Sequence, residues 1–314
     1  MLIRTIRGLK PLWEAVGIKH LESRISRSVI LIVSLSLISQ GWALPSFRSR
    51  RIISRPPQGS QVNKSHPLAR GLIGAWLFNE NAGNILYSLA SSPNATIQSP
   101  SSPWVQDELG PAINGTGSTT NYGIAGAGTI SLPVTIVAIV RPASTGVTRL
   151  QIFAHNNGAT ATNGIYVFGN NATPSNLFFG SVGNAETSLT GLNFTTLNVY
   201  YFLAITVSPT GGTLNGYMGF LGKTLSTASA GAVVLSHFAA TEFELGNCLN
   251  SSNNAFPGHI AEILYYNRVL SSQEINEINK NPFGMFRKSE SWNWTAPAIS
   301  ATVTPFRMLM GVGK

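Results

Sequence analysis

The chain has 314 residues, of which 43% are hydrophobic and only 11% are charged, so it can bury a substantial core and is not intrinsically disordered. Its single cysteine, Cys248, excludes an internal disulfide and a cysteine-based zinc site. The net charge of +9 is concentrated at the N-terminus: residues 1–70 hold 12 Lys and Arg against two Glu, whereas residues 71–314 hold 9 against 10 acidic residues. Because the larger part is nearly neutral, we expect no nucleic-acid binding.

The first 43 residues have the three-part pattern of a secretory signal. A basic leader precedes an apolar run from Val29 to Ile38, and Gly41-Trp42-Ala43 supplies the small-x-small pattern of a cleavage site. The apolar run of about ten residues is shorter than the roughly 20 that a membrane-spanning helix needs. We predict a secreted or cell-surface protein cleaved after Ala43. Because the leader is long, an uncleaved anchor, which would be the contact with a membrane, and a start assigned too far upstream stay open as alternatives.

The remaining chain divides into three further parts. Residues 44–67 are basic, Pro-rich and aperiodic, which is typical of a solvated linker. Residues 68–282 form the predicted domain. Residues 283–314 contain aromatic residues without helical or strand period, so we expect an extended tail packed on the body or on a neighbouring copy, through which the protein would form an oligomer.

Short apolar or alternating runs separated by Gly, Asn, Ser and Pro clusters follow one another through the domain, which predicts strands joined by turns. The predicted strands are Leu72–Phe78, Val134–Val140, Leu150–Ala154, Gly164–Phe168, Leu177–Val182, Tyr200–Val207, Gly216–Leu221, Ala232–Leu235, Phe243–Leu245 and Gly258–Tyr266. One helix is predicted after them, with Ser271 as N-cap, Glu274 as its capping partner, and Ile275 and Ile278 on one face. The pattern predicts an all-β, two-sheet antiparallel sandwich with one short C-terminal helix.

Three stretches of sequence occur in a recognisable order: 71–80 (GLIGAWLFNE), 132–142 (LPVTIVAIVRP) and 256–271 (FPGHIAEILYYNRVLS) followed by Glu274-Ile275. They resemble the opening strand, the central inner strand, and the last core strand with closing helix of laminin-G-like jelly rolls in the concanavalin A-like lectin and glucanase superfamily. The resemblance covers about residues 68–282 and implies a concanavalin A-like jelly roll. Residues 65–72 and 281–287 are similar to segments that bracket this domain in bacterial, prophage and phage proteins, which implies a surface or virion component.

Hydrolases of the same superfamily carry carboxylates at alternate positions of one strand, which places them on one face. The comparable pair here is Glu242 and Glu244. Phe243 and Leu245 are the expected core-facing residues, so both glutamates should face away from the core. The hydrolase pattern also has a middle Asp and a further Glu, where this chain has Glu244 and Asn247. We therefore expect no catalysis, and a glycoside hydrolase or lyase that uses this pair is an alternative.

Calcium is the metal that the family resemblance suggests, held by acidic side chains and loop carbonyls at the rim of the sandwich. Glu80 matches a usually acidic family position, but the next acidic position is lost in residues 86–92. We expect no cofactor, with calcium at Glu80 as the alternative. Glu262 and Arg268 are expected to form a polar pair that closes the fold, and the glycine-rich residues 123–129, which lack a P-loop lysine, are expected to form a turn.

Carbohydrate recognition needs aromatic faces for sugar rings and polar groups for hydroxyls. The predicted loops offer such side chains at Trp104, Tyr122, His155, Asn156, Asn157, Asn170 and Asn171. The sequence therefore predicts a non-enzymatic module that binds a carbohydrate or a surface protein through loops of a rigid sandwich. The alternative is a structural component of a virion or envelope that makes protein contacts only.

Overall fold

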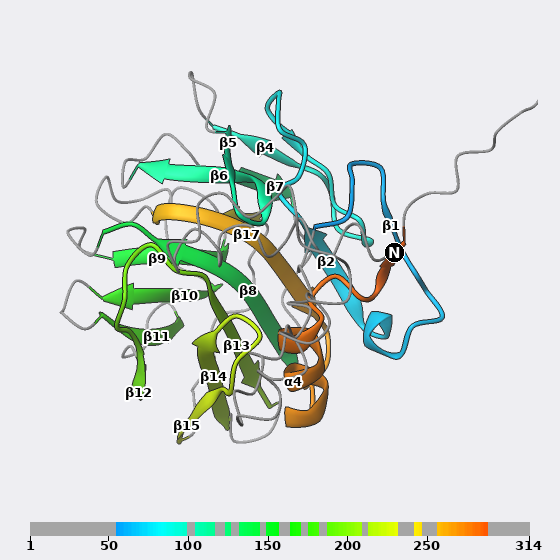
Figure 1. The fold of residues 1–314 in the computed structure, drawn as a ribbon. Coiled ribbons are helices and arrows are strands. Elements are labelled where there is room, and N and C mark those ends of the chain that lie inside the picture. Colours follow the sequence, from blue (N-terminus) through cyan, green and yellow to red (C-terminus); the bar gives the residue numbers. More distant parts are fainter. Residues whose placement is uncertain are drawn as a thin grey trace, which may run out of the picture. The chain divides into compact units, whose positions relative to one another are not determined.

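The computed structural model describes residues 55–98, 104–116, 123–126, 132–144, 149–156, 164–170, 175–181, 187–208, 213–231, 242–246 and 256–287. In this part of the chain, two large sheets with antiparallel pairing lie face to face (Figure 1). The predicted strand Ala232–Leu235 and Cys248 lie outside the described residues. No helix among the described residues combines the length and the apolar character needed to cross a membrane.

The first sheet, called here the β8 sheet, has the strand order β15-β14-β13-β8-β17-β6-β5. Strand β17 is long enough to pair along one side with two strands, β6 near its start and β2 near its end. The bounds are β2 (Leu72–Trp76), β5 (Trp104–Asp107), β6 (Gly110–Thr116), β8 (Val134–Pro142), β13 (Tyr201–Val207), β14 (Leu214–Phe220), β15 (Ser226–Ala230) and β17 (Pro257–Tyr266).

The second sheet, called here the β9 sheet, has the strand order β12-β11-β10-β9-β16-β7-β4-β3. Its strands β9 to β12 follow one another in the chain as hairpins, whereas β16 enters between β9 and β7 from much later in the sequence. The bounds are β3 (Ile85–Leu86), β4 (Ala95–Ile97), β7 (Gly123–Gly126), β9 (Arg149–Asn156), β10 (Gly164–Asn170), β11 (Ser175–Ser181), β12 (Thr187–Phe194) and β16 (Glu242–Leu245).

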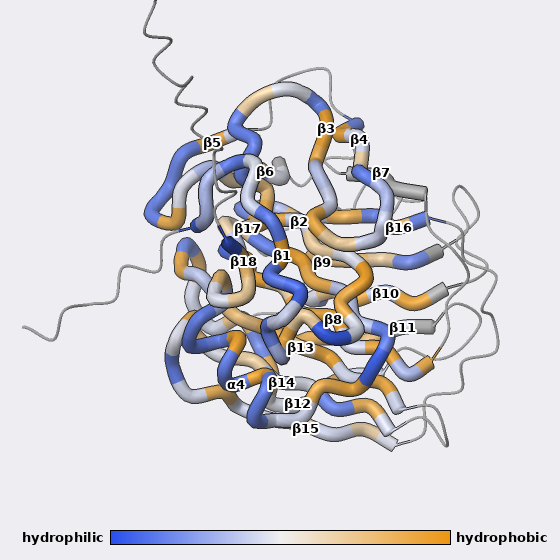
Figure 2. The backbone as a smooth tube through the Cα atoms, turned by 90° about the vertical axis from the view of Figure 1, so that its right-hand side faces the viewer, coloured by the Kyte–Doolittle hydropathy of each residue, from blue (hydrophilic) through white to orange (hydrophobic). Residues whose placement is uncertain are grey.

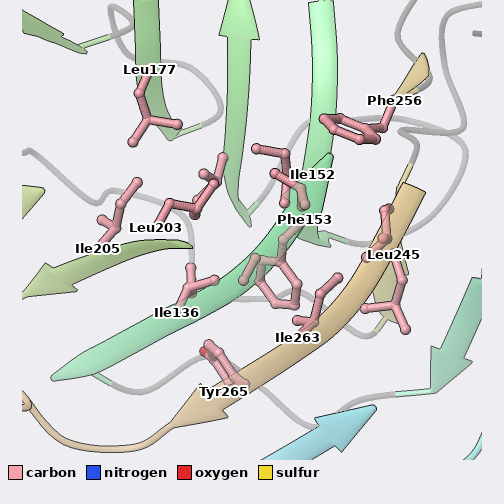
Figure 3. Packing of buried hydrophobic residues seen from close by; sticks show 14 of the residues in the cluster. Ile136, Ile152, Phe153, Leu177, Leu203, Ile205, Leu245, Phe256, Ile263 and Tyr265 are labelled. Carbon is pink, nitrogen blue, oxygen red and sulfur yellow. The ribbon is translucent and has the colours of Figure 1, made fainter. Parts of the chain in front are cut away.

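The main hydrophobic core lies between the two sheets, because alternate residues of each strand point to the same side. In the β8 sheet, Ile136 and Ile263 belong to this set, and in the β9 sheet Phe153 and Leu245 do (Figure 3). Phe153 stacks on Tyr265 across the interface with ring centroids 5.4 Å apart. Hydrophobic residues are correspondingly frequent along β8, β9, β10 and β13 (Figure 2).

A second hydrophobic cluster covers the outer face of the β8 sheet. Helix α4 (Ser272–Lys280) packs Ile275 and Ile278 onto this face and begins at Ser271 with the predicted capping box. The 3-10 turn η1 (Pro67–Ala69) adds Leu68 to the cluster. The predicted helix and its N-cap are thus confirmed.

The chain ends of the described region meet in a short two-stranded sheet. Strand β1 (Gln61–Val62) pairs with β18 (Phe286–Arg287), as the neighbouring blue and red segments show in Figure 1. Residues 55–63, expected to belong to a solvated linker, therefore make hydrogen bonds to the domain. At the other end Met285 is fully buried, so the first residues of the expected tail pack on the body.

The two-sheet sandwich is confirmed, and nine of the ten predicted strands overlap observed ones, while the tenth lies outside the described residues. The prediction of a turn at residues 123–129 is wrong for residues 123–126, which form β7 between β16 and β4. The prediction that Arg268 pairs with Glu262 is also wrong. Arg268 instead forms a two-bond ion pair with Glu274 at 2.7 and 3.0 Å, next to the helix cap, while Glu262 is fully buried.

Candidate functional site

The outer face of the β9 sheet, which points away from the main core, carries a row of aromatic side chains. On β10, Ile165 and Val167 enter the core, so alternation places Tyr166 and Phe168 on the outer face. On β11 the same argument places Phe178 beside Phe168, and their rings stack with centroids 5.3 Å apart. Tyr166 lies next in the row, 5.6 Å from Phe168. Phe168 is buried, whereas Tyr166 and Phe178 are partly exposed.

A glycine determines how the ring of Tyr166 lies. Gly180 is its Cα partner on β11, and a Cβ built at Gly180 would lie 2.1 Å from Cε2 of Tyr166. The ring therefore covers the space that a side chain at residue 180 would fill. On the other side Tyr166 faces Ala154 of β9, which is also small. The two small neighbours leave one aromatic face lying flat on the sheet.

Two carboxylates share this face. Phe243 and Leu245 of β16 enter the core, as predicted, so Glu242 and Glu244 point to the outer side of the β9 sheet. Glu244 is the Cα partner of Ala154, which places it in the same cross-strand row as Tyr166. Glu242 is partly exposed, but Glu244 is 0% exposed. A carboxylate without solvent access cannot reach a substrate unless the surrounding chain moves.

A separate polar cluster lies at one end of the β8 sheet. Asp107 at the end of β5 accepts a hydrogen bond from the hydroxyl of Tyr200 and another from Nδ1 of His259 at 2.8 Å. Burial would raise the pKa of Asp107, but the hydrogen bonds from His259 and Tyr200 outweigh it and lower the pKa. The side chain of Asp107 is only 4% exposed, so the cluster mainly connects the β5–β6 hairpin to β17 and the start of β13.

Sequence comparison identifies the family of the chain. A laminin-G model described as the concanavalin A-like lectin/glucanases superfamily matches residues 116–276, about half of the chain. The chain belongs to this superfamily. The resemblance to laminin-G-like jelly rolls is thereby confirmed. No curated protein matches the sequence significantly.

The solved structures that the chain resembles are distant in sequence. Trypanosoma rangeli sialidase in complex with 2,3-difluoro-KDN has a TM-score of 0.50 and 14% identity, over 72% of this chain and 36% of that chain. A SAP-like pentraxin from Limulus polyphemus has a TM-score of 0.40 and 12% identity, over 50% of this chain and 75% of that chain. The Ruminococcus gnavus sialidase CBM40 domain bound to α2,3-sialyllactose has a TM-score of 0.36 and 15% identity, over 47% of this chain and 82% of that chain.

The chain spans about a third of the length of the sialidases that it matches. At 14% identity the sialidase of TM-score 0.50 shows the fold alone.

The residues expected to bind a ligand from loops lie in different environments. The placement of His155 on a loop is wrong: it belongs to β9, is 2% exposed, and packs against Phe243 in the core with ring centroids 4.4 Å apart. Trp104 lies in β5 instead of a loop, and its indole N–H donates to the carbonyl of Gly83 at 2.9 Å. Both positions contribute to the packing of the sandwich.

The asparagines and the tyrosine of the expected site are described only in part. Asn170 ends β10, and its side-chain oxygen accepts from the backbone N–H of Asn176 at 2.8 Å, so it helps to close the β10–β11 hairpin. Asn156 ends β9, but its side chain is outside the described residues, as are Tyr122, Asn157 and Asn171. For these four positions, ligand binding stays a prediction.

Glu80, the expected calcium ligand, lies just beyond β2 and is 7% exposed. Its Oε1 accepts from the backbone N–H of Tyr87 at 2.8 Å, while Oε2 is buried without a hydrogen-bond donor among the described residues. Burial raises the pKa of Glu80. Within the described ranges no group of three or more His, Cys, Asp or Glu side chains is placed to hold a metal ion. Calcium binding at Glu80 stays a prediction.

The aromatic row was not predicted from the sequence. Its signal was present in the predicted strand Gly164–Phe168, where Tyr166 and Phe168 alternate with the aliphatic Ile165 and Val167. A strand in a two-sheet sandwich needs apolar residues on its inner side only. Partly exposed aromatic residues on the opposite side therefore indicate a surface that does more than pack the two sheets together.

Proposed function

We propose that this protein is a non-enzymatic carbohydrate-binding module whose binding surface is the outer face of the β9 sheet. The observation that supports this best is the row of Tyr166, Phe168 and Phe178, in which two rings are partly exposed on the side away from the core. Aromatic faces suit the apolar faces of sugar rings, and the nearby Glu242 and Asn176 offer acceptors and donors for hydroxyl groups.

The carboxylates of β16 argue against catalysis. A retaining glycosidase needs two carboxyl groups about 5–5.5 Å apart on either side of the scissile bond, and both must reach the substrate. Glu244 is 0% exposed, so only Glu242 of this pair is accessible. Binding through Glu242 requires no second carboxylate.

The proposal is tested by screening the full chain on a glycan array, with calcium and with a chelator. We expect saturable binding to one glycan class, and loss of that binding in Y166A and F178A. The matched control is F220A, because Phe220 is an aromatic residue 42% exposed on the β8 sheet. Binding should persist in F220A. In E242Q it should persist in weakened form, with no glycan hydrolysis by any variant.

Two outcomes would contradict the proposal. A blank array from folded protein would remove carbohydrate as the ligand. Binding that survives Y166A and F178A would move the site away from the β9 sheet, and the expected rim residues around Tyr122 and Asn157 would then be the next to substitute. Binding that is seen with calcium and lost with the chelator would identify calcium as a cofactor.

Export is part of the same proposal, supported by the signal-like pattern of residues 1–43. A secreted carbohydrate-binding module would be presented at a cell surface or, as the flanking segments suggest, on a virion. Mass spectrometry of the protein recovered from the producing cell checks this. A mature N-terminus at Leu44 supports cleavage after Ala43, whereas an intact leader in the membrane fraction supports an anchor.

A second candidate is a protein-binding role in an envelope or virion, favoured by exposed apolar side chains at a sheet edge. Ile85 on the edge strand β3 is 41% exposed, and Tyr87, two residues later, is 47% exposed. Sedimentation of the full chain, of I85S/Y87S and of a chain ending at Arg287 tests this role. Association that depends on either change supports protein contacts, and a monomer in all three counts against them.

A further inference from the structure

A row of polar side chains crosses the outer face of the β8 sheet where β17 begins. His259 of β17 has Asn114 of β6 and Arg141 of β8 as its Cα partners on either side. The adjacent residues Ile260 and Val140 point into the main core, so alternation places the polar row on the outer face. His259 and Arg141 are both partly exposed, so this part of the row is open to solvent.

The carboxylate of Asp107 determines which nitrogen of His259 is free. Burial would raise the pKa of Asp107, but the hydrogen bonds from His259 and Tyr200 lower it, so the carboxylate is ionised at neutral pH and can only accept. The neutral imidazole then carries its proton on Nδ1 and its lone pair on Nε2. The side chain of His259 is 17% exposed, and its Nε2 is neither buried nor hydrogen-bonded among the described residues. His259 therefore presents an oriented hydrogen-bond acceptor to solvent.

Arg141 places a hydrogen-bond donor beside this acceptor. Its Nε donates to the carbonyl of Asn198 at 2.9 Å, and its Nη1 lies 3.3 Å from Nδ1 of His259. Its Nη2 is neither buried nor hydrogen-bonded among the described residues. Because the guanidinium is planar, the positions of Nε and Nη1 fix the direction in which Nη2 donates. Each free nitrogen belongs to the same rigid group as one of the two nitrogens in contact, so Nε2 and Nη2 lie close together.

A fixed acceptor next to a fixed donor matches a pair of neighbouring hydroxyl groups. One hydroxyl can donate to Nε2 of His259 while the other accepts from Nη2 of Arg141. A carboxylate or a phosphate offers acceptors only, so it would meet the lone pair of Nε2. The negative charge of Asp107 behind the imidazole also offsets the positive charge of Arg141, which removes much of the attraction for an anion. The chemistry of the pair favours a neutral ligand with several hydroxyl groups.

We propose that His259 and Arg141 form a second binding site, which takes two neighbouring hydroxyl groups of a neutral sugar. Asp107 is a positioning residue in this site, because it acts on the ligand only through the tautomer and orientation of His259. The site lies on the β8 sheet, whereas the aromatic row lies on the β9 sheet. It is therefore independent of what the aromatic row binds, and a chain with both sites can connect two separate glycans.

Nitrogen NMR of the histidine side chains in the full chain tests the site, because it distinguishes the two tautomers and reports hydrogen bonding at each ring nitrogen. We expect the proton of neutral His259 on Nδ1. His66 is the control within the same spectrum: its Nδ1 accepts from the backbone N–H of Leu68 at 3.2 Å, so its proton should be on Nε2. Titration with D-mannose, D-galactose and D-glucose should shift Nε2 of His259 in a saturable manner for at least one sugar, with no saturable shift at His66.

Two variants separate the roles of the side chains. R141M should weaken the binding seen at His259 by about tenfold or more, because it removes a charged donor, whereas R70M should not change it. Arg70 is the matched control because it is an exposed arginine outside the polar row. D107N should move part of the His259 proton from Nδ1 to Nε2 and weaken binding in the same measure. If D107N does not fold, R141M still tests the site.

Three results would overturn the proposal. The first is a folded protein in which none of the three sugars shifts Nε2 of His259. The second is a shift that sodium sulfate produces and no sugar does, which would indicate an anion site. The third is equal sugar affinity in the wild type and R141M. The array experiment depends on Tyr166 and Phe178 instead, so either proposal can fail while the other holds.

Discussion

The position of Tyr166 over Gly180 allows the binding surface to be altered by one methyl group. In G180A the new Cβ would lie 2.1 Å from Cε2, 2.2 Å from Cζ and 2.6 Å from the hydroxyl oxygen of Tyr166. Ordinary contacts between such atoms are about 3.5–4.0 Å, so the ring has to move by roughly 1.5 Å. All three atoms belong to one side chain, which can rotate away from the sheet. The substitution should therefore disturb the aromatic row without breaking the strand pairing.

The free energy of unfolding should fall only slightly. Overpacking destabilises the folded state by about 1–3 kcal/mol, whereas alanine in place of a strand glycine stabilises it by about 0.5–1 kcal/mol. The free energy of unfolding should therefore fall by about 1 kcal/mol. At Gly115 the same methyl group would lie 1.8 Å from the carbonyl oxygen of Phe256, which is a backbone atom. Because a strand cannot rotate away, G115A should cost more than about 3 kcal/mol. At Gly231 it would meet no atom within 4 Å, so G231A is the neutral control.

Denaturant unfolding of the three variants, with glycan binding of each folded protein, measures both effects. We expect G180A to bind at least about tenfold more weakly than the wild type while G231A binds normally. If G180A loses as much stability as G115A, the ring of Tyr166 is fixed and cannot rotate away from the sheet. If G180A binds like the wild type while Y166A does not bind, the position of the ring over Gly180 does not matter for binding.

Three further predictions concern stability. S271A should lower the free energy of unfolding by about 1 kcal/mol, because Ser271 caps α4, whereas S272A should change it by less than about 0.5 kcal/mol in the same denaturant assay. The hydrogen bond from Arg268 lowers the pKa of Glu274, so ionised Glu274 stabilises the folded state. This stabilisation is fully present above the unfolded-state pKa of about 4.5 and is lost as the pH falls through the lower folded-state pKa. E274Q should therefore flatten the dependence of the free energy of unfolding on pH below about pH 5. F153A should cost about 3–5 kcal/mol, measured by denaturant unfolding, because it opens a cavity between the two sheets, and a loss below about 2 kcal/mol would show that the core can collapse into it.

The fold was predictable because its strongest signals are local. Buried strands such as β8 and β13 are largely apolar runs. The N-terminal cap of α4 depends on two residues only three positions apart, Ser271 and Glu274. The strands missed by the sequence analysis are short or polar, as in β15 with the sequence STASA. A strand such as β15, at the edge of the β8 sheet, forms because its neighbour offers free backbone groups, which is information that its own residues do not contain.

The candidate site was harder to predict because it depends on which strands become neighbours. Glu244 and Tyr166 are 78 positions apart, and only the insertion of β16 beside β9 places them in one row. The expected pair of Arg268 and Glu262 was wrong because Glu274, which lies six positions beyond Arg268, forms two hydrogen bonds with it beside the helix cap.

The two faces of the sandwich show different uses of the same strand pattern. On the β8 sheet the outward-facing residues include a buried hydrophobic cluster that lies under α4, η1 and residues 283–286, so this part of the face serves the stability of the domain. On the β9 sheet the outward-facing residues include Tyr166, Phe178 and Glu242, which are partly exposed. Exposed rings add little to the stability of the fold, because their surface stays in contact with water. Substituting Tyr166 or Phe178 should therefore separate binding from stability, which substitutions in the buried cluster of the β8 sheet cannot do.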